Sequence, residues 1–340
     1  MLQGGNSTPD ISRINVSGNI RKIHIEKSDW VQADETGDLD FQKTEGALHI
    51  INWQDCLSQM SSDILDRRAL AEESDWSFMK SSVVQYLFTI CIRLRLPNDV
   101  RYTAALIFST YMRRQIMQLH QFIEDQNMSA AQRAREWEKI ETTAERQIPL
   151  RLMSCIQISS KMHSYHESLS SRQVVNCLRA LSLPYTLAAV QASESRIFRM
   201  IGNKVPESPL TVCETAMKIL TYLMRNHDWV DKSKLDVIWQ HVLVILDICM
   251  LYHSLVYEKF VARFPTHNFP PNDSPAIVIT KFKWDFLLLA TSVIQTAVFC
   301  VEGIMNLNLI TKVLVKILKT DERNVILLHE SIIELIGEQR

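Results

Sequence analysis

The sequence predicts an all-α fold, for two reasons. Only eight of its 340 residues are glycine, about 2% against a usual share of roughly 7%, and sheet proteins need glycine at tight turns and bulges. Apolar residues also recur at helical spacing, in blocks that prolines separate. The scarcity of glycine further excludes the phosphate-binding loops of nucleotide-binding folds and the nucleophile elbow of hydrolases.

The first half of the chain begins with a tail and continues as a series of helices. Residues 1–46 are polar and turn-rich, so we expect them to be disordered. Residues 124–148 are charged and alanine-rich and predict an exposed insert, either a helix or an ordered loop. Pro149 stands where a helix would start, and Gly202 with Asn203 would close the last helix. The helices predicted here span residues 48–68, 74–96, 100–123, 150–160, 170–181 and 185–201.

The second half predicts another helical set beyond a boundary at Pro206 and Pro209. Its five helical blocks match in number those of the first half, if the preceding helix and the insert are left out. The stretch Phe286–Val301 is shorter than a membrane span and polar residues interrupt it, so a buried helix is favoured. The predicted blocks are 210–225, 232–260, 281–302, 306–318 and 321–336.

Composition limits the functional classes. The 37 basic and 38 acidic residues give a net charge of −1, which offers no overall electrostatic case for nucleic-acid binding but leaves a local basic patch open. The seven cysteines are widely spaced and never form C-x-x-C, so we expect reduced core thiols of an intracellular protein. No apolar signal-peptide core follows the first residue, so we do not expect secretion.

Three local patterns contain residues that could carry a chemical role. His163, His166 and Glu167 could hold zinc, but two further ligands are missing at recognisable spacing and a solvated loop is favoured. Proline-directed phosphorylation sites at Thr8, Ser208 and Ser274 rest on two residues each and are weak signals. The basic cluster offers a nucleic-acid patch, but solvated helix faces and ends are favoured. That cluster comprises Arg93, Arg95, Arg101, Arg113 and Arg114, with Tyr102 and Tyr111 between them.

No pattern supports an enzyme. The acidic pairs do not extend into a magnesium-binding run, and a Ser-His-Asp triad is defined by geometry rather than by sequence. We therefore assign no catalytic residue, metal, cofactor or small-molecule substrate to the chain.

Five segments carry a resemblance to the cyclin family. Leu150–Lys161, with the sequence LRLMSCIQISSK, resembles the central helix of a cyclin box, and Glu194–Gly202 resembles the fifth helix. Val205–Val212 is similar to the proline-containing exit into a second box. Met79–Leu87 stands where the first-helix motif belongs, and Leu96–Val100 where the second helix begins.

This resemblance implies a cyclin-like fold of two five-helix cyclin-box repeats, preceded by an N-terminal helix and the disordered tail. The implied parts are the tail (1–46), the N-terminal helix with the first box and its insert 124–148 (47–206), and a divergent second repeat (207–340). Cyclins are binding modules that dock on the mobile regulatory helix of a protein kinase, so the resemblance also implies a non-catalytic protein.

The resemblance implies specific binding residues. In cyclins a lysine at the end of the central helix and a glutamate in the fifth helix hydrogen-bond the backbone of the kinase, and Lys161 and Glu194 match these positions. An ammonium group donates to open carbonyls and a carboxylate accepts from open N–H groups, so the residue types suit helix ends. Without the family match, ordinary surface charges would be the favoured interpretation of both residues.

Two departures from the family pattern limit what is carried over. Lys80 and Ser109 replace the usual arginine and aspartate, so the salt bridge that joins the first two helices of a usual box cannot form. Tyr86 stands where the substrate-docking patch has tryptophan. Lys80 and Tyr86 remain candidate partner-binding residues, but kinase activation and recruitment of cell-cycle substrates are not carried over.

The charged insert and Asp285–Ala290 are similar to one divergent branch of the family. That similarity implies a scaffold in meiotic crossover maturation, with a cyclin-dependent kinase or meiotic crossover factors as partners. We expect a nuclear location, with a cytoplasmic pool left open, and neither membrane association nor direct nucleic-acid binding. The alternative is a nucleic-acid-associated helical adaptor, like the transcription factors that share the cyclin-box fold.

Overall fold

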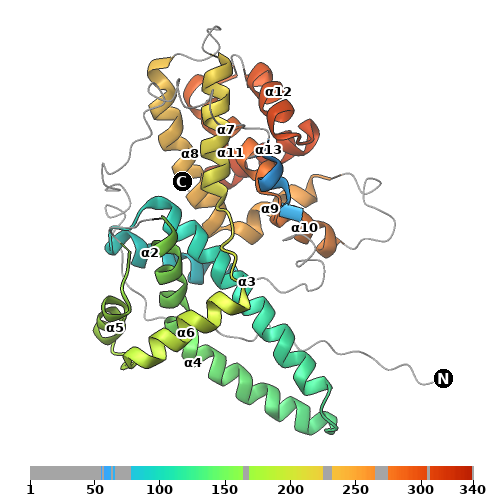
Figure 1. Ribbon diagram of the computed structural model, residues 1–340. Helices are drawn as coiled ribbons and strands as arrows, with labels where there is room; N and C mark the ends of the chain where they lie inside the picture. The colour runs from blue at the N-terminus through green and yellow to red at the C-terminus, as the bar shows by residue number, and fades with distance from the viewer. Residues whose placement is uncertain are drawn as a thin grey trace, which may run out of the picture.

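The computed structural model describes residues 55, 57–62, 64–65, 78–163, 168–224, 232–264, 275–304 and 307–338. All regular structure within these residues is helical, which confirms the predicted all-α class (Figure 1). The expected tail lies outside the described residues. The described part of the predicted N-terminal helix is helical, and its buried side chains Leu57, Met60 and Ile64 join the main hydrophobic core.

Five helices form the first repeat. Four of them surround the second half of the fifth, α4, in which every residue from 148 to 160 is buried, as expected for the central helix of a helical repeat. Gly202 (φ +81°) and Asn203 (φ +56°) follow the last of these helices in the left-handed region, which confirms the predicted ending. The helices are α2 (Ser81–Arg93), α3 (Asn98–Glu124), α4 (Ala130–His163), α5 (Ser171–Ala180) and α6 (Leu187–Met200).

The insert predicted at 124–148 is not a separate element. The end of α3 and the first half of α4 run side by side and project from the body as a two-helix arm (Figure 1). Within the arm, the rings of His120 and Trp137 meet edge to face, with their centroids 6.1 Å apart. Pro149 lies inside α4, so the prediction that a helix starts there was wrong. A proline costs about 3 kcal/mol inside a helix, and packing of α4 against α3 on both sides of Pro149 offsets that cost.

The second repeat is built around α11, which packs against α7, α8, α12 and α13. All residues of α11 from Phe286 to Val298 are buried except Leu287, which is partly buried. This confirms the predicted buried helix. The helices of this repeat are α7 (Pro209–Met224), α8 (Leu235–Leu251), α9 (His253–Ala262), α10 (Pro275–Lys283), α11 (Phe286–Glu302), α12 (Leu307–Leu318) and α13 (Glu322–Glu338).

Two predicted blocks of the second repeat are each broken into two helices. The block 232–260 bends by 88° between α8 and α9, and the block 281–302 is interrupted between α10 and α11. At the second break the carboxylate of Asp285 accepts a hydrogen bond from the backbone N–H of Leu288 (3.0 Å) and starts a new helix. The described residues therefore contain seven α-helices in this repeat rather than five.

A membrane-span test gives a limited result for the described helices. None is both long enough and apolar enough alone, and α8 with α9 would qualify only as a pair across their 88° bend.

The first turn of α3 joins the two repeats through a buried arginine and a partly buried aspartate. The Arg101 guanidinium donates to both carboxylate oxygens of Asp247 in α8, at 3.0 and 2.9 Å. The Tyr102 hydroxyl donates to the same carboxylate at 2.6 Å, and Arg101 also donates to Asn98 Oδ1 at 2.7 Å. With 6% of its surface exposed, Arg101 lies in a setting where a bidentate carboxylate partner offsets much of the cost of burying a charge.

Farther along α3, Arg113 makes a second contact between the repeats. Its guanidinium carbon lies 4.6 Å from the centre of the Trp284 ring, just before α11. Burial, assisted by the nearby charge of Arg114, lowers the pKa of Arg113 to about 10. Both Arg101 and Arg113 are buried, so the expectation of solvated helix faces was wrong for these two residues, and they are not available to a nucleic-acid backbone either.

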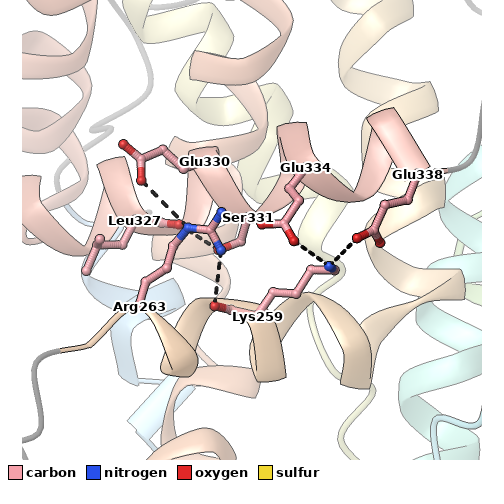
Figure 2. Close-up of polar contacts among 7 residues, drawn as sticks. All are labelled: Lys259, Arg263, Leu327, Glu330, Ser331, Glu334 and Glu338. Carbon is pink, nitrogen blue, oxygen red and sulfur yellow. Dashed lines mark hydrogen bonds and ion pairs between the residues drawn. The ribbon is translucent and has the colours of Figure 1, made fainter.

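A row of ion pairs joins α13 to α9 (Figure 2). Lys259 donates to Glu334 at 2.6 Å and to Glu338 at 2.7 Å. Arg263 pairs with Glu334 and reaches Glu330 at 3.7 Å. Hydrogen bonds from Lys259 and then Arg263 lower the pKa of Glu334 to about 2, so this carboxylate stays charged well into acid.

We expect Asp247→Asn to lower the free energy of unfolding by about 3 kcal/mol, because it leaves Arg101 buried without a countercharge. Urea denaturation measures the loss. Asp236→Asn, an exposed position on the same helix, should change it by less than about 0.5 kcal/mol. The apolar pair Arg101→Met with Asp247→Leu should recover much of the stability, and equal losses in Asp247→Asn and Asp236→Asn would contradict the account.

The ion pairs between α9 and α13 should make the free energy of unfolding depend on pH in the acidic range. Because the pKa of Glu334 is lowered in the folded chain, its stabilisation is fully present above an unfolded pKa of about 4.5 and disappears as the pH falls toward 2. Glu334→Gln should therefore lower the urea midpoint at pH 7, and its difference from the parent chain should shrink steadily below pH 4.5. A pH-independent difference would assign the effect of Glu334 to packing.

Candidate partner-binding site

Buried polar contacts fix how α6 sits against α4. The hydroxyl of Ser193 accepts hydrogen bonds at 2.8 Å from Arg151 Nη1 and from the Ser154 hydroxyl. Arg151 is held in turn by Gln147, whose side-chain oxygen accepts from Nη2 at 2.6 Å. Because Glu194 directly follows Ser193 in α6, these contacts also determine where its carboxylate points.

Lys161 and Glu194 meet at the surface beside this buried contact. Lys161 lies in the last turn of α4, and its Nζ is 2.5 Å from Oε1 of Glu194. The side chains are 44% and 20% exposed. An ammonium group has three donors and a carboxylate about four acceptor sites, so each group can hydrogen-bond a partner while the pair stays intact. The structure thus brings together the two principal residues that the sequence predicted.

Exposed apolar side chains lie beside this pair, which sequence reasoning did not assign. Met162 follows Lys161 and is 60% exposed, while Phe198 and Leu187 of α6 are 36% and 39% exposed. Leu187, Glu194 and Phe198 share one helix face, since they are spaced at i, i+7 and i+11. That spacing was the available signal, because it separates Phe198 from the buried Ile197. We call Lys161, Met162, Leu187, Glu194 and Phe198 the α4–α6 surface.

The other two predicted binding residues lie on a different element. Lys80 stands just before α2, where its carbonyl accepts from the N–H groups of Val83 and Val84 at 2.9 and 3.1 Å. Tyr86 lies within α2 and is only 9% exposed, and burial raises the pKa of its hydroxyl. Tyr86 therefore shapes this region mainly from beneath the surface, and the binding roles of both residues stay predictions. Ser109 is buried within α3.

The structure places some residues of the histidine cluster and of the proline-directed phosphorylation sites. His163 Nε2 lies 2.9 Å from the Thr103 hydroxyl, while His166 and Glu167 lie outside the described residues. Within the described residues no group of three potential ligands is placed to hold a metal ion. Ser208 is 1% exposed and its hydroxyl donates to Asp99 at 3.1 Å, which leaves little access for a kinase. Thr8 and Ser274 lie outside the described residues.

Most described cysteines fit the predicted core thiols. Cys91, Cys155, Cys213 and Cys249 are free and buried, and burial raises the pKa of Cys91 to about 12. Cys177 is half-buried and Cys300 is exposed, so the core prediction was wrong for Cys300.

Comparison with known proteins supports the cyclin-like interpretation. No protein-family model matches the chain. The human cyclin N-terminal domain-containing protein 1 is 26% identical over 223 residues, which cover 65% of this chain and 66% of the relative. The mouse protein of the same name is 25% identical over 224 residues, covering 66% and 65%. The matches thus span just under two thirds of each relative.

The helical architecture and these matches agree. The described residues form a first set of five helices with α4 at its centre and a second helical set around α11, and curated relatives carry the cyclin N-terminal domain in their names. The chain is therefore an all-α, cyclin-like protein, and its predicted resemblance to cyclin N-terminal domain-containing protein 1 is confirmed.

Proposed function

We propose that this chain is a non-catalytic regulatory or scaffold protein that binds a helix of a partner protein through its first repeat. The partner would be a cyclin-dependent kinase or a component of a recombination complex. The observation that carries the proposal is the partly exposed Lys161–Glu194 pair, which joins α4 and α6. In the cyclin resemblance these two residues match the lysine and glutamate that bind the kinase.

The α4–α6 surface suits a helical partner chemically. The end of a helix exposes carbonyls or N–H groups that have no partner within the helix, and Lys161 can donate to the former while Glu194 accepts from the latter. The exposed side chains of Met162 and Phe198 add apolar area beside the charges, and burying apolar area stabilises a complex by roughly 25 cal/mol per Å² before the costs of association.

The biological setting of the proposal follows the cyclin resemblance. We propose a role in meiotic crossover maturation and a nuclear location, with the tail and the α3–α4 arm supplying further contacts. A large exposed surface on the arm supports its part in the proposal, since most residues from 121 to 146 are exposed or half-buried. Affinity purification from meiotic cells, with identification of kinases and crossover factors, tests this setting.

A charge exchange tests the site itself. Lys161→Glu with Glu194→Lys preserves an ion pair between α4 and α6 but presents each charge to the partner with reversed sign. We expect recovery of the partner to fall at least about tenfold, while the free energy of unfolding changes by less than about 1 kcal/mol. Quantitative co-purification and urea denaturation measure the two effects.

The arm offers a matched control for the exchange. Lys139 and Glu136 form an exposed pair with Nζ and Oε1 2.6 Å apart, and exchanging these two charges should leave partner recovery unchanged. Unchanged recovery with the Lys161–Glu194 exchange would remove the α4–α6 surface from the interface. Equal losses with both exchanges would indicate a nonspecific effect of charge.

A further inference from the structure

The near-neutral net charge of the chain conceals a basic first repeat. Residues 78–206 contain seventeen lysines and arginines against nine aspartates and glutamates. The acidic residues are also unevenly placed, because none occurs in 78–98 or in 168–193. These two stretches include α2, the loop that follows it, α5 and the start of α6, so a part of the first repeat has cationic groups and no carboxylate on its own elements.

A hollow lies between two of these elements. It has a volume of about 450 Å³ and separates the end of α2 and its loop from α5. Leu94, Leu96, Leu169 and Cys177 supply its apolar lining, and Arg95 and Asn176 are among its polar residues. We call it the α2–α5 hollow. It includes none of the residues of the α4–α6 surface.

One exposed arginine lines the hollow, and two more lie on α5 beside its lining residue Asn176. Arg95 lines it from a backbone with φ +53°, a conformation uncommon for a residue with a side chain. Arg172, Asn176 and Arg179 follow one another at i, i+4 and i+7 on α5 and therefore share a face. Arg179 donates to the Asn176 side chain at 3.4 Å, which places its guanidinium beside the hollow.

These guanidinium groups keep their charge available to a ligand. None of Arg95, Arg172 and Arg179 takes part in an ion pair in the described part of the chain, whereas Arg101 and Arg263 both have carboxylate partners. Guanidinium groups bind carboxylates and phosphates through paired hydrogen bonds. The hollow therefore combines a partly apolar lining with nearby guanidinium groups that attract negative charge.

The apolar residues of the hollow help to distinguish between two classes of anionic partner, nucleic acids and acidic peptides. Single-stranded nucleic acid is usually held by aromatic side chains on which bases stack, and none of the described residues that line the hollow is aromatic. A peptide can place one apolar side chain on the leucines while its acidic neighbours reach the arginines. Combined charge and apolar complementarity therefore favour a peptide over a nucleic-acid backbone.

We propose that the α2–α5 hollow is a second docking site, which binds an acidic peptide segment of a partner protein. An apolar side chain of the segment enters the hollow, and carboxylates or phosphates on either side of it pair with Arg95, Arg172 and Arg179. The site is separate from the α4–α6 surface, so the proposal does not depend on the function proposed above.

Fluorescence anisotropy with the full chain tests the proposal directly. The probe is a labelled twelve-residue peptide with a central leucine and three aspartates on each side. Arg172→Glu with Arg179→Glu should weaken its binding at least about tenfold. The control is Arg135→Glu with Arg146→Glu, two exposed arginines on the arm, which removes the same total charge and should leave binding within about twofold of the parent chain.

Two further probes separate the contribution of the acidic residues of the peptide from that of its apolar residue. Replacing the aspartates of the probe by asparagine, or its leucine by glycine, should each weaken binding at least about fivefold. Asn176→Trp fills the hollow without changing charge and should also weaken binding, which keeps the test valid if the double arginine variant fails to fold.

Three results would overturn the proposal: no binding of the aspartate probe by the parent chain, equal losses in the hollow and arm variants, or full binding of the asparagine probe. A twenty-base-pair DNA duplex that binds more tightly than the peptide and loses affinity with Arg172→Glu and Arg179→Glu would assign the surface to nucleic acid instead.

Discussion

The structure depends on one buried contact, the pairing of Arg101 in α3 with Asp247 in α8. The two residues are 146 positions apart, and their bidentate hydrogen bonds fix the first turn of α3 against the second repeat. The same helix carries Arg113, which stacks on Trp284, and Arg114, which donates to the Met200 carbonyl at the end of α6 at 2.8 Å. Helix α3 therefore positions both the second repeat and the end of α6.

The geometry of the proposed partner-binding site depends on these contacts of α3. Packing of α3 against α4 places the buried half of α4, where the hydroxyl of Ser159 donates to the Val100 carbonyl at 2.9 Å. Arg151 and Ser154 then hold Ser193, and Glu194 is the next residue along α6. The Lys161–Glu194 pair is exposed, and exposed pairs contribute little to stability. Its place in the fold comes from the buried contacts beneath it, which leaves the pair free to serve binding.

Much of this arrangement could be predicted from sequence, because local signals specify it. Apolar periodicity located the helices, Gly202 marked the end of α6, and the motif positions of Lys161 and Glu194 placed them on two neighbouring helices. Other features depend on contacts distant in the chain. The continuation of α4 through Pro149 rests on packing with α3. The burial of Arg101 depends on Asp247, whose only sequence signal was a carboxylate within the apolar helix α8.

Calorimetric unfolding of the whole chain tests the central claim, that buried contacts of α3 make the two repeats one cooperative unit. We expect a single transition for the parent chain, with a ratio of calorimetric to van't Hoff enthalpy of about 1. When Asp247 is replaced by asparagine, we expect two separate transitions. Two independent transitions in the parent chain, unaffected by that replacement, would contradict the account.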